Sequence, residues 1–161
     1  MAGAPRDGEE LLPFDPAEGD GPRVAFIGRV RSPWRPDGEH PKNIRKAREM
    51  GGAARIELDP AYAPGLKGLS AGQYVIVVYW MDRARRDIIV QRPRHVDGPR
   101  GTFALRSPVR PTPIAMSTVR ITALDADAGV VEIDAIDCFD GTPVVDIKPW
   151  LETVDMPPER L

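Results

Sequence analysis

Arg106-Ser-Pro-Val-Arg-Pro-Thr-Pro-Ile-Ala-Met-Ser117 is the stretch around which the rest of the chain is organised. Three prolines fall within positions 108–113. Each proline fixes its own φ at about −65° and restrains the preceding residue to extended geometry, so this stretch cannot form a helix. Arg106 and Arg110 carry planar guanidinium groups that suit carboxylates, phosphates or a stacked base. The stretch is either a rigid binding element or a proline-rich connection between strands with solvated arginines.

Short apolar runs with the pattern of β-strands lie on both sides of this stretch. Gln73–Met81 is the most apolar run, and its β-branched residues predict a strand that is buried on both faces. Ala115–Leu124 alternates between apolar and polar residues and, with Val130–Ile136, predicts a hairpin. The same criteria predict five more strands, at Arg23–Arg31, Ala54–Leu58, Asp87–Gln91, Gly101–Leu105 and Val144–Ile147. These short strands predict an all-β barrel or sandwich.

Few helical signals interrupt the predicted strands. Asn43–Met50 is long enough for about two helical turns with Asn43 as the N-cap. Asp59–Leu69 holds two prolines and two glycines and is expected to be irregular, with at most one helical turn. We expect one domain over residues 23–155, a flexible N-terminal tail over 1–22 and a loose C-terminal tail over 156–161.

Composition excludes several classes of protein. The 18 prolines and 15 glycines among 161 residues favour turns and short strands over long helices, and the net charge of −2 gives no global basic field for nucleic acid. Cys138 is the single cysteine, which excludes an internal disulfide, and we expect it to be buried. His40 and His95 lack the spacing of a metal pair, so no metal is expected. The chain shows no membrane-spanning run or signal peptide, which makes the cytoplasm the expected compartment.

A second polar cluster lies near the C-terminus, in the stretch 137–150. Asp140-Gly141 predicts a tight turn, and the backbone N–H groups of such a turn can bind an adenine edge or a carboxylate. Asp146, Lys148 and Trp150 share one face of an extended segment. They form either part of a ligand site or a surface ion pair beside a packed aromatic. The chain has no recognisable nucleophile setting, dinucleotide-binding glycine pattern or phosphate loop. From these residues alone we infer a β-rich domain with an arginine-bearing ligand site and no assigned reaction.

Five motifs occur in one order along the chain: Ile27-Gly-Arg-Val-Arg-Ser-Pro33, Ala54-Arg-Ile-Glu-Leu58, Gly65-Leu-Lys-Gly-Leu69, Arg106-Ser-Pro-Val-Arg-Pro-Thr-Pro-Ile114 and Asp140-Gly-Thr-Pro-Val-Val-Asp-Ile-Lys-Pro149. Together they resemble a known family, the TsaA/TrmO-like (YaeB/VirR) tRNA methyltransferases. The resemblance covers roughly residues 24–155. It implies a closed single-sheet β-barrel of about seven strands with long loops and short helical turns, which forms a homodimer. It also implies methyl transfer from S-adenosylmethionine to N6 of threonylcarbamoyladenosine beside the tRNA anticodon.

The resemblance also assigns site residues by position. Those assigned to the cofactor are Pro41, Lys42, Asn43, Trp80, Met81, Arg106, Met116, Asp140, Gly141 and Thr142. Arg110 and Lys148 are weaker candidates for substrate binding, and no catalytic residue is assigned. Methyl transfer depends mainly on orientation of the two reactants, and Asp137 or Asp146 is a candidate to accept the proton.

Two alternatives remain open from the sequence. The chain departs from the family pattern at Trp80, Met81, Thr112 and Ala115. These departures motivate the first alternative, an S-adenosylmethionine-binding module without transfer activity. The net charge of −2 motivates the second, a methyltransferase for a small molecule.

Overall fold

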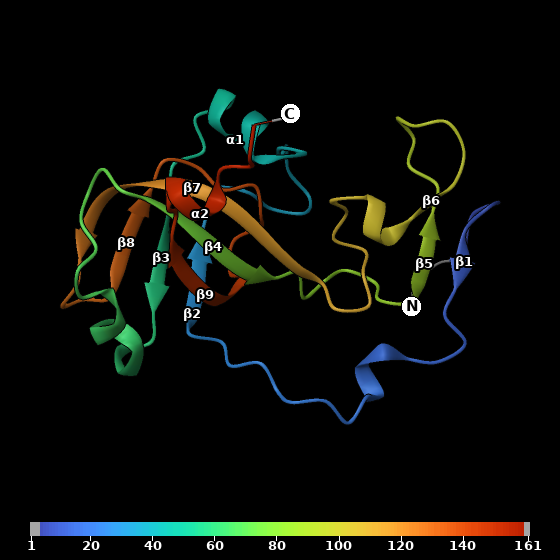
Figure 1. The fold of residues 1–161 in the computed structure, drawn as a ribbon, viewed down its shortest axis with the longest axis horizontal. Helices are drawn as coiled ribbons and strands as arrows, with labels where there is room; N and C mark the ends of the chain where they lie inside the picture. The colour runs from blue at the N-terminus through green and yellow to red at the C-terminus, as the bar shows by residue number, and fades with distance from the viewer. Residues whose placement is uncertain (1–3, 160–161) are drawn as a thin grey trace. The chain divides into compact units, whose positions relative to one another are not determined.

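The structure is a computed structural model, and it describes residues 4–159. The chain divides into two compact units. The barrel unit combines Val24–Tyr79 with the chain from Met116 onward, and the smaller unit combines the N-terminal segment through Arg23 with Trp80–Ala115. The barrel unit is built mainly from strands, and the smaller unit holds three short strands between irregular segments (Figure 1). This confirms the prediction of a mainly β chain.

Six strands of the described chain form one closed sheet in the order β2-β3-β8-β7-β4-β9. Their bounds are Gly28–Arg31 for β2, Ala54–Leu58 for β3, Tyr74–Trp80 for β4, Ile114–Asp125 for β7, Val130–Ile133 for β8 and Pro143–Pro149 for β9. The ring closes because β9 pairs with β2, with Gly28 opposite Val144 and Arg29 opposite Pro143. The expectation of about seven strands in a single sheet is wrong, because three short strands form a second sheet elsewhere.

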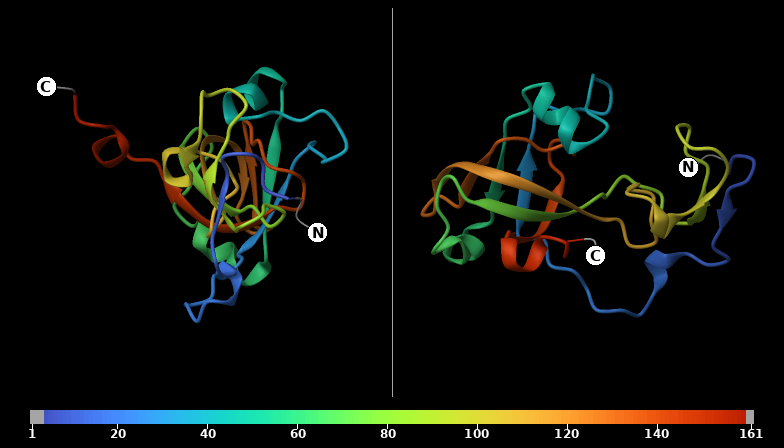
Figure 2. Two further views of the ribbon diagram at one scale, coloured as in Figure 1. Left: turned by 90° about the vertical axis from the view of Figure 1, so that its right-hand side faces the viewer. Right: turned by 45° about the horizontal axis from the view of Figure 1, so that its top comes forward.

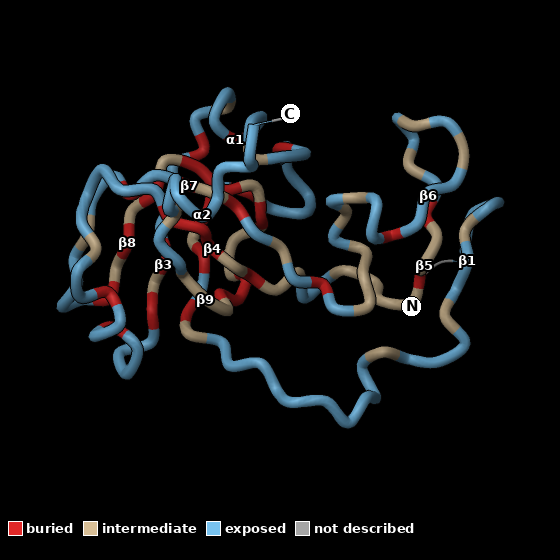
Figure 3. Tube along the Cα trace, viewed as in Figure 1, coloured by how far each residue is buried: buried red, intermediate tan, exposed pale blue. Residues whose placement is uncertain are grey.

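Alternation of apolar and polar residues turns one face of each strand toward the core of the barrel unit. In β2 and β3, the buried residues alternate with exposed or half-buried charged residues. β4 is buried from Val75 through Val77, as predicted for a strand covered on both faces. Figure 3 shows the buried positions concentrated in this sheet. Completely buried apolar side chains come from all six strands: Val30, Ile56, Val75, Val77, Val119, Ile121, Val131 and Val144.

The predicted hairpin is confirmed as β7 and β8. The two strands pair antiparallel, with Ile121 opposite Ile133 and Asp125 opposite Val130. Gly129 in the turn has a φ of 70°, a conformation that glycine adopts without strain. The register shifts between Ile121 and Ala123, so the regular alternation of β7 ends at this irregularity.

The smaller unit contains the three-stranded sheet, in the order β1-β5-β6. Its strands are β1 (Glu10–Leu11), β5 (Ile88–Gln91) and β6 (Arg100–Gly101), with the 3-10 helix η1 (Pro16–Glu18) nearby in the chain. The prediction of a strand at Gly101–Leu105 is wrong, because Thr102–Ala104 forms the 3-10 helix η3. Thr102 is buried there, where its hydroxyl donates to the Ile88 carbonyl and accepts from the Gln91 amide.

Helices are short throughout the described chain. Helix α1 (Ile44–Glu49) has Asn43 as its N-cap, whose side chain accepts a hydrogen bond from the backbone N–H of Lys46 at 2.9 Å. This confirms the predicted cap. The 3-10 helix η2 spans Pro60–Leu66, and α2 (Glu152–Asp155) follows β9 and projects from it in Figure 2. Among the described residues, every helix is too short or too polar to cross a bilayer.

The predicted domain boundaries remain a prediction. Part of the segment expected as an N-terminal tail, Glu10–Leu11, pairs with β5. The tail predictions over 1–22 and 156–161 also include residues 1–3 and 160–161, which lie outside the described residues. The first predicted strand, Arg23–Arg31, begins later than expected, at Gly28.

Candidate functional site

The proline-rich stretch 106–113 is an irregular connection that leads into β7. Arg110 does not extend away from this connection, because its Nη1 donates to the carbonyls of Leu105 at 2.7 Å and Ser107 at 3.2 Å. Arg106 is exposed. Arg110 therefore stabilises its own loop, and the assignment of Arg106 to a ligand stays a prediction.

Trp80 is the last residue of β4, and Met81 follows it directly. The guanidinium of Arg86 lies 5.5 Å from the centroid of the Trp80 ring, which is within the range of a cation–π contact. Arg86 also donates to the Pro111 carbonyl at 2.6 Å, and the backbone N–H of Met81 donates to the Pro113 carbonyl at 2.8 Å. One face of the indole is therefore covered from within the smaller unit, and these contacts hold the proline-rich stretch against the end of β4.

In the barrel unit, the turn Asp140–Thr142 is bonded to β2 and to the chain that follows β2. The N–H of Gly141 donates to the Val30 carbonyl at 2.8 Å, and the N–H of Asp140 donates to the Trp34 carbonyl at 3.0 Å. The hydroxyl of Thr142 donates to the Phe139 carbonyl at 2.7 Å. The backbone N–H groups of this turn, which the sequence suggested for ligand binding, are therefore already bonded, to Val30 of β2, to Trp34 and, for Thr142, to the Phe139 carbonyl.

The outward group at this turn is the Asp140 carboxylate. Its Oδ1 accepts from the backbone N–H of Ser32 at 3.2 Å. Its Oδ2 lies 3.5 Å from Arg35 Nη2 and 3.9 Å from Arg31 Nη1. Gly141 next to it has a φ of 82°, and a Cβ built there would meet no atom within 4 Å. The turn therefore presents an oriented carboxylate beside open space.

The loop after β2 packs against the segment that precedes this turn. Trp34 is buried, and its indole N–H donates to the Ile136 carbonyl at 2.6 Å. The His40 ring meets the Phe139 ring edge-on, with centroids 5.0 Å apart. These contacts link the loop residues Pro41, Lys42 and Asn43, of which Pro41 is buried and the other two exposed, to the Asp140 turn within one unit.

Sequence reasoning missed a buried polar group beside this turn. The Tyr79 hydroxyl donates to Asp137 Oδ1 at 2.9 Å and lies 3.0 Å from Ser117 Oγ. Burial, and secondarily the Asp137 charge, raises the pKa of Tyr79, so its hydroxyl stays protonated and acts as a donor. Tyr79 belongs to the apolar run 73–81. A polar hydroxyl within such a run was the sequence signal that could have indicated a buried hydrogen bond. Cys138 is buried as predicted, and burial raises the pKa of its thiol to about 12.

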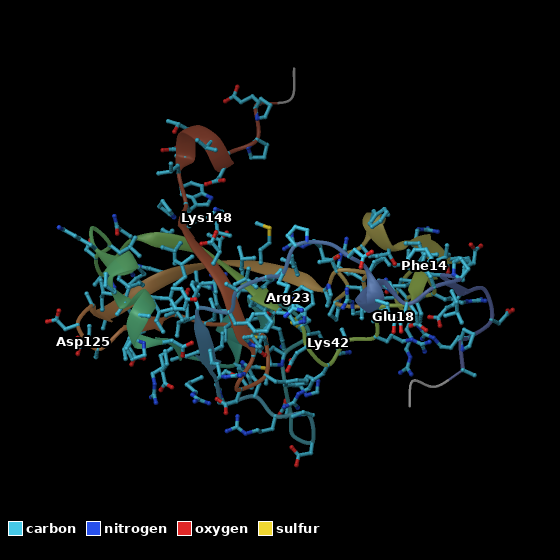
Figure 4. All side chains as sticks on the ribbon, turned by 90° about the horizontal axis from the view of Figure 1, so that it is seen from below. Phe14, Glu18, Arg23, Lys42, Asp125 and Lys148 are labelled. Atoms are coloured by element: carbon cyan, nitrogen blue, oxygen red, sulfur yellow. The ribbon has the colours of Figure 1, made fainter. Side chains whose placement is uncertain are left out.

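The remaining site candidates lie on β7 and β9. Met116 on β7 is about half exposed. Lys148 lies near the end of β9, where the chain leads toward α2 (Figure 4), and its Nζ pairs with Asp146 at 2.8 Å. The surface ion pair, which the sequence left as the alternative to a ligand site on this face of β9, is therefore present, and substrate binding by Lys148 stays a prediction.

Comparison with protein families identifies the chain. The family model described as the tRNA-methyltransferase O N-terminal domain matches residues 29–156. The chain belongs to the TrmO family. The match includes both the loop after β2 and the Asp140 turn, and it confirms the family that the five sequence motifs predicted.

Relatives in the TrmO family share the domain at moderate identity. A protein of Archaeoglobus fulgidus named a probable S-adenosyl-L-methionine-binding protein is 40% identical over 80% of this chain and 34% of its own length. The probable S-adenosyl-L-methionine-binding protein VirR of Rhizobium radiobacter is 37% identical over 83% of this chain and 73% of its own length. The chain thus spans about a third of the first relative and about three quarters of the second.

Solved TrmO structures have the same fold. TrmO from Pseudomonas aeruginosa superposes with a TM-score of 0.66 at 28% identity, covering 89% of this chain and 61% of that one. A second TrmO structure gives a TM-score of 0.70 at 28% identity, covering 88% of this chain and 62% of that one. The chain spans about three fifths of these TrmO proteins.

The structure distributes the predicted TrmO site residues over both units. The barrel unit holds Pro41, Lys42, Asn43, Met116, Asp140, Gly141, Thr142 and Lys148, and the smaller unit holds Trp80, Met81, Arg106 and Arg110. Within the barrel unit, His40 before the loop 41–43 packs edge-on against Phe139 before the turn 140–142. That these residues bind a cofactor or a substrate stays a prediction.

Proposed function

We propose that this chain is an S-adenosylmethionine-dependent methyltransferase that acts on tRNA. One observation carries the proposal: the TrmO family match over residues 29–156 includes the loop 41–43 and the Asp140 turn, whose preceding residues, His40 and Phe139, are in ring contact within the barrel unit. The relatives named as S-adenosyl-L-methionine-binding proteins support the cofactor. The family model and the solved TrmO structures support the tRNA.

The chemistry of the Asp140 turn fits such a cofactor. S-adenosylmethionine carries a positive sulfonium and an ammonium group, and it supplies the methyl group when bound. A carboxylate attracts both cationic groups. Asp140 is oriented by the Ser32 N–H and faces Arg35 and Arg31, and the neighbouring Gly141 borders open space. In this proposal Asp140 and the exposed Lys42 bind and orient the cofactor through side chains, since the N–H groups of the turn are already bonded.

For the acceptor, we propose N6 of threonylcarbamoyladenosine next to the tRNA anticodon, as the family resemblance implies. The candidates to accept the proton released from N6 are Asp137 and Asp146. Asp137 accepts a hydrogen bond from the Tyr79 hydroxyl, and Asp146 pairs with Lys148. The proposal includes a homodimer and a cytoplasmic location. Arg106, Trp80 and Met81 in the smaller unit are the further cofactor candidates, with Thr142, Pro41, Asn43 and Met116 in the barrel unit.

A binding module without transfer activity is the second candidate. The observation in its favour is that the curated relatives are named for binding S-adenosyl-L-methionine and not for a reaction. A methyltransferase for a small molecule is a third candidate, for which the net charge of −2 is the available support.

Calorimetric titration with S-adenosylmethionine is the first test. We expect micromolar binding by the wild type and loss of binding in Arg106→Ala. Arg94→Ala, which removes another exposed arginine of the smaller unit, is the matched control and should bind normally. No binding by a folded wild type would overturn the proposal.

Transfer is then tested by incubating the protein with S-adenosylmethionine and bulk tRNA, followed by mass spectrometry of the digested nucleosides. A methylated threonylcarbamoyladenosine supports the proposed acceptor. Cofactor binding without methylation of any nucleoside would favour the binding module, and methylation of a small molecule would favour the third candidate.

A further inference from the structure

The outer face of β2 and β3 carries a cluster of arginines. β2 buries Val30 and turns Arg29 and Arg31 outward, while β3 turns Arg55 outward beside Glu57. The two strands are adjacent in the sheet (Figure 1), and Arg31 lies directly opposite Arg55 in the register. Two cations in directly opposed positions destabilise a strand pair, so this arrangement needs an explanation beyond folding.

Glu57 only partly compensates the opposed pair. Its two oxygens accept from Arg31 Nε at 2.8 Å and from Arg55 Nε at 2.8 Å. A single carboxylate therefore serves two guanidinium groups, each of which has five N–H donors. On the other side of β3, Glu132 of β8 is the register partner of Arg55 and adds one more acidic residue at the edge of this face.

The cluster continues from the strands to the Asp140 turn. Arg29 donates to the Gly141 carbonyl at 2.9 Å, and no ion pair found within residues 4–159 includes Arg29. Arg31 and Arg35 share the Asp140 carboxylate. Arg35 also donates to the carbonyls of Ser32 and Trp34. All four arginine side chains stay partly or largely exposed after these contacts, and the cluster reaches the turn that the proposed function assigns to the cofactor.

Charge is unevenly distributed along the chain around this face. The segment 28–58, which contains β2, α1 and β3, holds eight basic and four acidic residues, whereas the rest of the chain holds 14 basic and 20 acidic residues. The excess continues into the loop and α1 with Lys42, Arg45 and Lys46, all exposed. A net charge of −2 for the whole chain therefore conceals a local basic surface.

We propose that the outer face of β2 and β3, with Arg29, Arg31, Arg35 and Arg55, is a docking surface for the phosphodiester backbone of RNA. Planar guanidinium forks bind phosphate oxygens in pairs, and phosphate contacts position a nucleic acid without reading its sequence. Arg29 and Arg31 are two residues apart on one strand, which separates them by about 7 Å and suits successive contacts along a backbone. The inference rests on the proposed function for its RNA, which it places beside the Asp140 turn.

The test measures binding of bulk tRNA to the full chain by fluorescence anisotropy, between about 50 and 200 mM salt. The test variant is Arg29→Gln with Arg55→Gln. The control is Lys67→Gln with Arg120→Gln, which removes two exposed positive charges. Lys67 directly follows η2, and Arg120 lies on β7, a strand that pairs with neither β2 nor β3. Thermal denaturation of each variant checks folding, and in Arg55→Gln the Glu57 carboxylate keeps Arg31 as its partner.

We expect the slope of log affinity against log salt to fall by about 1.4 to 1.8 in the test variant, since each lost phosphate contact removes about 0.7 to 0.9. The control variant should keep the wild-type slope. Equal slopes in the two variants, or an affinity for polyglutamate with none for tRNA, would overturn the docking surface.

A parallel titration with S-adenosylmethionine separates this inference from the proposed function. If tRNA binds through the arginines and S-adenosylmethionine does not bind, the docking surface holds and the methyltransferase proposal fails. If the cofactor binds and the test variant binds tRNA as the wild type does, the docking surface fails alone.

Discussion

Asp140 Oδ1 accepts a hydrogen bond from the backbone N–H of Ser32 at 3.2 Å, across 108 positions of sequence. The bond is one of several that tie the segment 138–142 to β2 and the residues after it, together with those from Gly141 to Val30 and from Ser32 Oγ to the Cys138 carbonyl. The orientation of the Asp140 carboxylate is therefore fixed by the barrel itself, before any ligand binds.

Substitution of Asp140 separates its charge from its structural hydrogen bond. Asp140→Asn keeps an oxygen that accepts from Ser32, whereas Asp140→Ala removes the acceptor and should cost about 1 kcal/mol of the free energy of unfolding. Both variants should weaken S-adenosylmethionine binding by about 10-fold or more, the range for losing one charged partner. Urea denaturation and calorimetry give the two values. Asp125→Asn is the control, and wild-type affinity in Asp140→Asn would remove Asp140 from the site.

Gly52, which follows α1, leaves room for the buried ring of Trp34 in the loop after β2. A Cβ at Gly52 would overlap the Trp34 ring, which is buried against Ala47 and Ala135. Gly52→Ala should therefore lower the free energy of unfolding by about 1–3 kcal/mol through overpacking. Gly65→Ala is the matched control, because a Cβ there meets no atom within 4 Å. Urea denaturation of both variants measures the difference, and equal stability would contradict the packing argument.

Local signals predicted the elements that depend on neighbouring residues. The Asn43 cap and the hairpin of β7 and β8 follow from side chains a few positions apart, and both are confirmed. The segment 101–105 was predicted as a strand from its short apolar pattern. It forms η3 instead because Thr102 bonds to Gln91 and Ile88, contacts that a local pattern does not contain.

For the site, the sequence identified the Asp140 turn but not the partners of its backbone. The turn signal Asp-Gly is local, so it was found. The bonds from Gly141 and Asp140 to Val30 and Trp34 exist only because β9 pairs with β2 and closes the ring. The same closure brings Arg31, Arg35 and Asp140 together, which is why the arginine cluster is visible only in the structure.

The buried hydroxyl pair of Tyr79 and Ser117 should be energetically coupled. Tyr79→Phe removes the hydroxyl that bonds to Ser117 and Asp137, and the loss of buried partners should cost about 1–3 kcal/mol of the free energy of unfolding. The double variant with Ser117→Ala should lose less than the sum of the single losses, because it leaves one fewer polar group without a partner. A double-mutant cycle by urea denaturation measures the coupling, and strict additivity would refute it.

Glu57 should give the barrel unit a pH-dependent stability. Hydrogen bonds from Arg31, and next from Arg55, lower the pKa of Glu57 below its ordinary value of 4.5. Because the folded state binds the Glu57 proton less readily than the unfolded state, this contribution is present above about pH 4.5 and is lost as pH falls through the folded pKa. Glu57→Gln cannot titrate and removes the carboxylate that bridges the opposed Arg31 and Arg55. We therefore expect its Tm to lie below that of the wild type at pH 7.

The Tm difference between the wild type and Glu57→Gln should then shrink as the pH is lowered below about 4.5, where protonation removes the charge of the wild-type carboxyl as well. Thermal denaturation followed by circular dichroism across this range measures it. Added salt should reduce the difference at pH 7, because the side chains of Arg31 and Arg55 are 42% and 49% exposed. A Tm difference that stays constant with pH would show that Glu57 stabilises the strand pair by packing and not by its charge.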